Sequence, residues 1–200
     1  MIKIIRLICI SIICIVMSAL ADEQHKAVDQ YVDKLVDDAQ IVLHNTKLTD
    51  EERSNKSKAL IAANLDLNWM AKYTLGRYKK QLAEKELQEF IQSYSQYVIK
   101  TYADLVKNYK GEKATIKQVE TVDTNEFIVR TEVIKTNGQP PIKVDYFVKN
   151  IANNNAPVKF LIADVITEGI SMINSQRSEF DSILTNNGIA VLIATLKKKL

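Results

Sequence analysis

Cysteine, glycine and histidine are scarce in this chain of 200 residues. Both cysteines, Cys9 and Cys14, precede residue 22, so the rest of the chain has no thiol for a disulfide or a metal site. The five glycines are scattered, which excludes a glycine-rich phosphate loop. Only His25 and His44 are present, without H-E-x-x-H spacing, and no G-x-S-x-G nucleophile motif occurs. We therefore expect no catalytic residues, no metal and no cofactor.

A charge excess of one sign is also lacking. The chain has 27 Lys and Arg residues against 24 Asp and Glu residues, a formal net charge of +3. A nucleic-acid-binding protein needs a concentrated basic surface, so this balance predicts no nucleic-acid partner. With 46% hydrophobic residues, the chain has enough apolar side chains to build one core of its own.

The long apolar run lies at the N-terminus. Lys3 and Arg6 flank its start, Leu7–Met17 is apolar, and Ala19–Ala21 has the A-x-A pattern of a signal-peptidase site. This run is shorter than the roughly 18 apolar residues that span a bilayer. We predict a signal peptide over 1–21, with an uncleaved anchor as the alternative. Cleavage would leave 25 basic and 24 acidic residues, a net charge of +1.

The first half of the predicted mature chain has helical periodicity. Apolar residues recur at three- and four-residue steps over Val28–Val42 and again from about Glu84 to Tyr109. Thr49 precedes three acidic residues and is expected to cap another helix, and Gly76 is expected to end a short one. The pattern predicts a helical region over 22–110.

The period changes from 3.6 to 2 after Gly111. Four strand-like runs follow, at about 114–122, 126–135, 142–149 and 160–167. The fourth run is apolar on both faces, which favours a place in the middle of the sheet. Helical spacing returns over 168–199, with Gly188 between two helices. The order predicts a single α+β domain over 22–200, with helices packed against a four-stranded antiparallel sheet.

Asp164 is an acidic residue inside the apolar fourth run, where an unpaired charge would be costly. We expect it to be paired with a nearby base such as Arg177 or with backbone donors. Gly169 marks the corner where this strand turns into the following helix.

Several segments resemble the MlaC family of periplasmic phospholipid-binding proteins, also called the toluene-tolerance family. The stretch DVITEGISM from Asp164, followed by Arg177 and Phe180, is similar to the family signature. Four further segments agree in order and spacing: LG-x-Y at Leu75–Tyr78, TYA-x-x-L from Thr101 with Tyr109, N-G-x-P from Asn137, and the closing helix from Gly188.

This resemblance implies an NTF2-like fold, a twisted four-stranded antiparallel sheet wrapped by helices, with acyl chains held between sheet and helices. It implies a periplasmic location and phospholipid as cargo. It also implies two partners, an outer-membrane lipoprotein complex and an inner-membrane ABC transporter with an MCE-domain subunit. Each methylene exposed to water costs ~0.8 kcal/mol, so a carrier of this kind needs an enclosed apolar pocket.

Ten side chains are candidates for the lining of that pocket. Ile170 comes first, because the strand-to-helix corner beside Gly169 is expected to open toward the pocket. For the other nine, plain core packing is an equal alternative: Leu67, Met70, Leu75, Tyr94, Tyr102, Val129, Tyr146, Val165 and Ile166.

Two other functions stay open at this point. An extracytoplasmic protein–protein adaptor would use the same scaffold with a filled core and no lipid cavity. A lipid-modifying enzyme would need His25 or His44 in the pocket.

Overall fold

The structure is a computed structural model that describes residues 2–106, 112–136, 138–152 and 159–200, with backbone alone for 2–22 and 106. Tyr109, Gly111 and Asn137, which enter the sequence argument, lie outside these ranges. The helices are α1 (Ile2–His44), α2 (Asp50–Asn64), α3 (Leu67–Thr74), the 3-10 helix η1 (Gly76–Lys80), α4 (Glu84–Val106) and α5 (Met172–Lys198).

One antiparallel sheet has the strand order β1-β2-β3-β4-β5. Its strands are β1 (Lys113–Asp123), β2 (Glu126–Ile134), β3 (Ile142–Asn150), β4 (Phe160–Thr167) and β5 (Ile170–Ser171). The predicted α+β fold is confirmed, and all four predicted strands are present, but the sheet has five strands rather than four. The two-residue β5 falls in the stretch expected to be helical. The chain folds back after Thr167, and Ile170 pairs with Thr167 before α5 begins.

The central position predicted for β4 is wrong. Only the short β5 lies beyond it, so β4 is close to the edge of the sheet. Its side chains are nevertheless buried from Phe160 to Asp164, because α2, α3 and α5 all pack against this strand. A strand that is covered by helices, such as β4, therefore has the same apolar pattern as a strand in the middle of a sheet.

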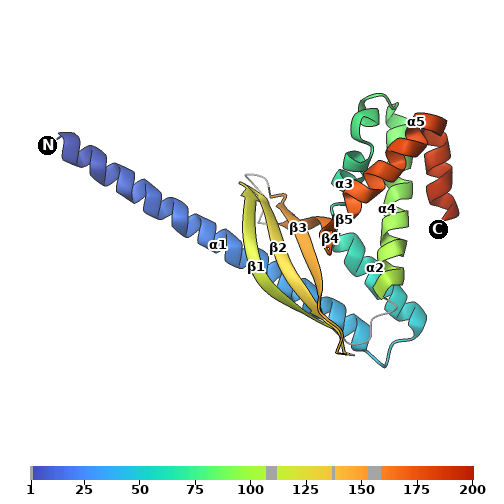
Figure 1. Ribbon diagram of the computed structural model, residues 1–200, viewed down its shortest axis with the longest axis horizontal. Coiled ribbons are helices and arrows are strands. Elements are labelled where there is room, and N and C mark those ends of the chain that lie inside the picture. The colour runs from blue at the N-terminus through green and yellow to red at the C-terminus, as the bar shows by residue number, and fades with distance from the viewer. Residues whose placement is uncertain (1, 107–111, 137, 153–158) are drawn as a thin grey trace.

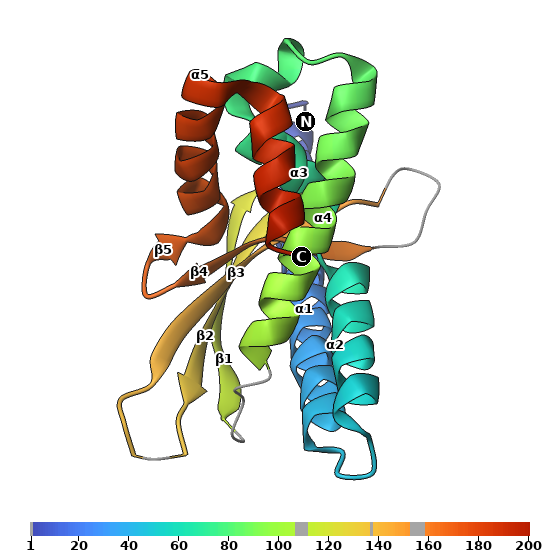
Figure 2. The ribbon, with the colours of Figure 1, turned by 90° about the vertical axis from the view of Figure 1, so that its right-hand side faces the viewer.

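Helices cover the sheet on the side where the core forms. The C-terminal half of α1 crosses β1 and β2, and its N-terminal part extends away from the sheet (Figure 1). Figure 2 shows α2 alongside α1, with α4 next to it. The core joins Val28 and Val32 of α1 to Phe127 of β2, Phe90 of α4 and Phe180 of α5, all at most 1% exposed.

The backbone requires a glycine at position 188, where a break between two helices is predicted. Gly188 has φ +79° and ψ 178° within α5, which interrupts the helix at the predicted place. An L-residue with a side chain seldom adopts this φ, so glycine allows the two halves of α5 to change direction.

The β4–α5 corner is organised by Asp164. Its Oδ2 accepts a hydrogen bond from the Ser171 hydroxyl at 2.5 Å, and its Oδ1 accepts one from the Ile173 N–H at 3.1 Å. Burial raises the pKa of the Asp164 carboxyl, and these hydrogen bonds act in the opposite direction. The predicted backbone donors are present. Arg177 instead lies over the ring of Tyr73, 5.1 Å from its centre.

Among the described residues, no helix combines the length and apolarity that crossing a membrane requires.

Candidate functional site

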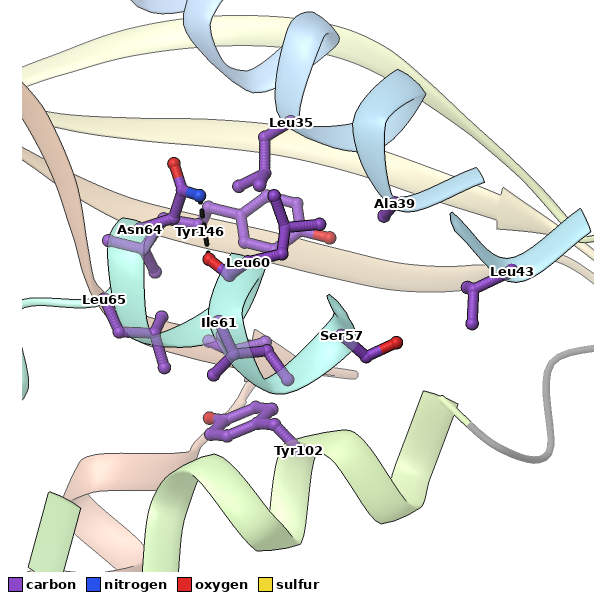
Figure 3. A pocket seen from close by; sticks show the side chains of 12 residues that line it. Leu35, Ala39, Leu43, Ser57, Leu60, Ile61, Asn64, Leu65, Tyr102 and Tyr146 are labelled. Carbon is purple, nitrogen blue, oxygen red and sulfur yellow. Dashed lines mark hydrogen bonds between the residues drawn. The ribbon is translucent and has the colours of Figure 1, made fainter. Parts of the chain in front are cut away.

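An apolar cavity of about 180 Å³ lies between three helices and the sheet (Figure 3). Its walls come from α1, α2, α4, β3 and β4, so segments far apart in the sequence meet here. The lining residues are Leu35, Ala39, Leu43, Ser57, Leu60, Ile61, Asn64, Leu65, Tyr102, Tyr146, Ile162 and Val165.

The helical walls follow from residue spacing. Leu35, Ala39 and Leu43 recur every four residues and so share one face of α1. The α2 residues at positions 57, 60, 61 and 64 form a second face with the i, i+3, i+4, i+7 pattern. The two faces are turned toward the same space.

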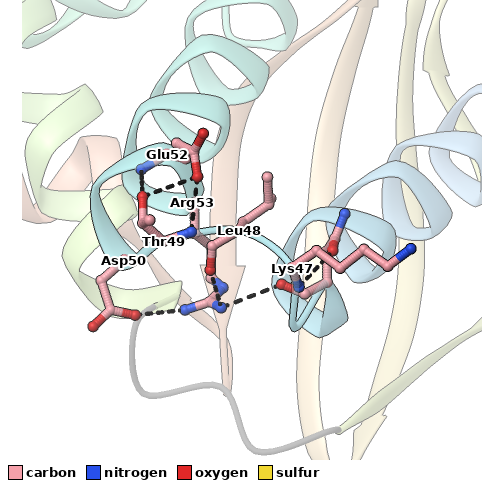
Figure 4. A network of polar contacts seen from close by, with 7 residues as sticks. Lys47, Leu48, Thr49, Asp50, Glu52 and Arg53 are labelled. Carbon is pink, nitrogen blue, oxygen red and sulfur yellow. Dashed lines mark hydrogen bonds and ion pairs between the residues drawn. The ribbon is translucent and has the colours of Figure 1, made fainter.

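The turn between α1 and α2 is held by a polar network (Figure 4). Thr49 Oγ1 accepts a hydrogen bond from the Glu52 N–H at 3.2 Å, and the Thr49 N–H donates to Glu52 Oε2 at 2.8 Å. This capping box confirms the predicted N-cap. The Arg53 guanidinium donates to the Asn45 and Leu48 carbonyls at 3.3 and 3.2 Å, and to the Asp50 carboxylate at 2.7 Å. The network lies in the turn that joins the two helices lining the cavity.

The sheet contributes one face of β3 and β4. Tyr146 is paired with Val165, and Val148 with Ile162. Directly opposite residues on neighbouring antiparallel strands project from the same face. Tyr146, Val165 and Ile162 therefore reach the cavity together.

Polar groups in the walls are few. The Asn64 amide donates to the Leu60 carbonyl at 2.8 Å, so it is engaged within α2. The hydroxyl oxygen of Tyr102 is buried and has no hydrogen-bond partner in the described chain. Burial raises the pKa of Tyr102, with a further contribution from Asp164, and burial likewise raises the pKa of Tyr146. Both phenols are therefore protonated at physiological pH.

The volume limits what the cavity can hold. An apolar cavity of about 150 Å³ in another protein accommodates benzene, whereas sites for drug-sized ligands start near 300 Å³. At about 180 Å³, this cavity has room for a segment of an acyl chain. A complete two-chain lipid would have to widen it or extend beyond it.

The ten candidate residues separate into distinct environments. Tyr102, Tyr146 and Val165 line the cavity. Met70, Leu75, Tyr94 and Val129 are packed in the core, at most 1% exposed, and Leu67 packs against that core.

Ile166 and Ile170 lie elsewhere. Ile166 is next to Val165 on β4 and so faces the other side of the sheet. Ile170 is 64% exposed on β5. The lipid contacts of all ten residues remain predictions.

Nine lining residues were not among the sequence candidates, and all but Ile162 lie in α1, in α2 or directly after it. Their apolar faces were recognisable from helical spacing, as at Leu60 and Ile61, but spacing does not distinguish a cavity wall from a filled core.

Catalytic and metal-binding groups do not gather at this cavity. His25 Nε2 lies 2.5 Å from the Thr121 hydroxyl, and its ring packs edge-on against Phe127. Neither His25 nor His44 lines the cavity. The described ranges contain no group of three or more His, Cys, Asp or Glu side chains placed to hold a metal ion.

Comparisons with known proteins agree with this architecture. The chain is 25% identical over 174 residues to the intermembrane phospholipid transport system binding protein MlaC of Haemophilus influenzae, covering 84% of this chain and 78% of that protein. The fold matches the phospholipid-binding protein of Ralstonia solanacearum, solved in complex with a phospholipid, with a TM-score of 0.71 and 20% identity. That match covers 86% of this chain and 95% of the other. The family model described as MlaC protein matches residues 27–198. This chain belongs to the MlaC family.

Proposed function

We propose that this protein is a periplasmic phospholipid carrier that encloses acyl-chain carbon in the cavity between α1, α2, α4 and the sheet. The observation that carries the proposal is the cavity itself, whose walls are mainly aliphatic side chains such as Leu35, Leu60 and Ile61. The names of its relatives, which describe phospholipid binding and transport, support the same assignment.

Burial of acyl carbon favours binding at this cavity. Transfer of an acyl chain from water into apolar surroundings contributes ~0.8 kcal/mol for each buried methylene. A cavity lined in this way is therefore suited to methylene groups.

The face of the sheet that lines the cavity continues along β4 toward the sheet edge. Val165 lines the cavity, and Thr167, two residues further along β4, projects from the same face. Thr167 is paired with Ile170 on β5, so the exposed Ile170 extends this face toward the sheet edge. We propose that the part of the lipid outside the cavity covers Ile170.

Location and partners belong to the same proposal. It includes a signal peptide over 1–21 and a mature lipid-binding domain over 22–200. The family match begins at residue 27, after the predicted cleavage site, which supports this division. The proposed partners are an outer-membrane lipoprotein complex and an inner-membrane ABC transporter with an MCE-domain subunit.

The two alternatives have less support. A protein–protein adaptor needs no cavity, and its core would be filled. An enzyme acting on the lipid through His25 or His44 would need one of them at the cavity wall, which neither reaches. We therefore propose a role in binding without catalysis or cofactor.

Lipid extraction tests the proposal directly. The full-length chain is expressed in a Gram-negative host that exports it, purified, denatured in organic solvent and analysed by mass spectrometry. We expect co-purified glycerophospholipid, and reloading after the stripped protein is incubated with phospholipid vesicles. Absence of lipid in both measurements would refute the carrier and leave the adaptor.

A further inference from the structure

Three residues with hydroxyl groups line the cavity: Ser57 of α2, Tyr102 of α4 and Tyr146 of β3. The Tyr102 hydroxyl is buried and has no hydrogen-bond partner within the described chain. Two tyrosines elsewhere have partners. The Tyr94 hydroxyl donates to Gln176 at 2.7 Å, and that of Tyr73 donates to Asn174 at 2.8 Å.

The three hydroxyls come from three elements and surround the same apolar side chains. Figure 3 shows the rings of Tyr146 and Tyr102 on either side of the α2 side chains Leu60 and Ile61. Ser57 is 6% exposed and belongs to the same face of α2. The arrangement places separate hydroxyl groups in a space lined otherwise by apolar side chains and by Asn64, whose amide is engaged within α2.

Unpartnered buried hydroxyls are uncommon in folded proteins, because each forfeits the hydrogen bonds that it makes with water. A methylene chain cannot satisfy the buried Tyr102 hydroxyl. A hydrogen-bond acceptor that belongs to an otherwise apolar molecule can satisfy it. A diacyl phospholipid has two such acceptors, the ester carbonyl oxygens at the heads of its chains.

We propose that the hydroxyls of Ser57, Tyr102 and Tyr146 donate hydrogen bonds to the ester carbonyls of the bound lipid, so that the cavity selects ester-linked over ether-linked phospholipids. This inference rests on the proposed carrier function. The Tyr102 hydroxyl, which is buried in the wall, becomes reachable when a ligand larger than about 180 Å³ widens the cavity.

A competition between matched lipids tests the selection. Stripped full-length protein is incubated with vesicles containing equal amounts of dioleoyl phosphatidylcholine and its dioleyl ether analogue, which lacks the two carbonyls. Bound lipid is then extracted and quantified by mass spectrometry. We expect the ester lipid to be enriched about tenfold, the effect of one or two hydrogen bonds.

The variants locate the effect. Tyr102→Phe and Tyr146→Phe should each lower the ester-to-ether ratio severalfold, and the double variant should bring it close to one. Ser57→Ala should also lower the ratio. Tyr97→Phe, on α4 outside the cavity lining, is the control and should keep the wild-type ratio.

Each outcome has a distinct meaning. Equal uptake of both lipids by the wild type, or a preference that survives the double variant, would overturn the selection while leaving the carrier intact. Failure of either lipid to bind would instead refute the carrier.

Thermal unfolding of lipid-free protein separates a ligand-binding hydroxyl from a structural one. Tyr102→Phe removes no protein hydrogen bond and should not lower the melting temperature. Tyr94→Phe should lower it, because the Gln176 carbonyl loses its donor. A decrease for Tyr102→Phe as large as that for Tyr94→Phe would assign Tyr102 a structural role and overturn its part in the inference.

Discussion

Filling the cavity should stabilise the protein and block its function at the same time. Ala39 lies on the wall formed by α1, where a larger side chain would occupy the space proposed for the acyl chain. Ala39→Leu adds three carbon atoms. At about 0.8 kcal/mol for each buried carbon group, lipid-free protein should gain about 2 kcal/mol in free energy of unfolding. For a chain of this size, this corresponds to a melting temperature higher by roughly 4–8 °C.

The test combines two measurements, melting temperature and lipid uptake, that should change in opposite directions. Melting temperature is measured on stripped protein, and lipid uptake from vesicles is measured on the same sample. We expect the first to rise and the second to fall. Ala63→Leu is the matched control. Ala63 is exposed on α2 and does not line the cavity, so this change should alter neither melting temperature nor lipid uptake.

Two results would refute the reasoning. Higher stability with unchanged lipid uptake would show that lipid binds elsewhere. Lower stability would show that the space beside Ala39 is too tightly packed for three more carbon atoms.

Three further changes test other parts of the structure. Ile170→Glu should leave the melting temperature unchanged, because this side chain is 64% exposed, and should reduce lipid uptake; normal uptake would remove Ile170 from the proposed lipid surface. Thr49→Ala removes the side-chain cap of α2 and should lower the free energy of unfolding by about 1 kcal/mol in urea denaturation; no change would mean that the Arg53 contacts alone hold the turn. Burial raises the pKa of Asp164 above 3.8, so the folded protein holds this proton more tightly than the unfolded chain does. The contribution of Asp164 to stability is therefore greatest below pH 3.8 and is lost as the pH rises through the folded-state pKa. Asp164→Asn should remove this part of the dependence of melting temperature on pH, and an unaltered pH profile would contradict the raised pKa.

Local signals account for what the sequence determined. The helix cap at Thr49 and the break at Gly188 depend on one or two residues and their immediate neighbours, and both occur where predicted. Three of the four predicted strands follow from alternation along short segments, and the fourth, β4, follows from a short run that is apolar on both faces. Even the apolar faces of α1 and α2, with Leu35 and Leu60, can be recognised from spacing alone. These features depend on interactions within a few residues, so they are encoded in the order of the amino acids.

Partners that are distant in the chain were decided only by the tertiary structure. Asp164 had two kinds of possible partner in the sequence, and the fold brought Ser171 and the start of α5 to it while Arg177 stacked on Tyr73. The pattern of β4 indicated burial on both faces, but only the packed helices revealed that the strand lies near the edge.

The cavity is the clearest case. Tyr94 and Tyr102 lie on one face of α4, two helical turns apart, and no periodicity distinguishes them. In the folded protein, the Tyr94 hydroxyl bonds to Gln176 in the core, whereas the Tyr102 hydroxyl has no partner among the described residues and its side chain lines the cavity. A hydrophobic pattern indicates which side chains are shielded from water. Whether the space that they face is filled depends on the shapes of five elements that meet only after folding.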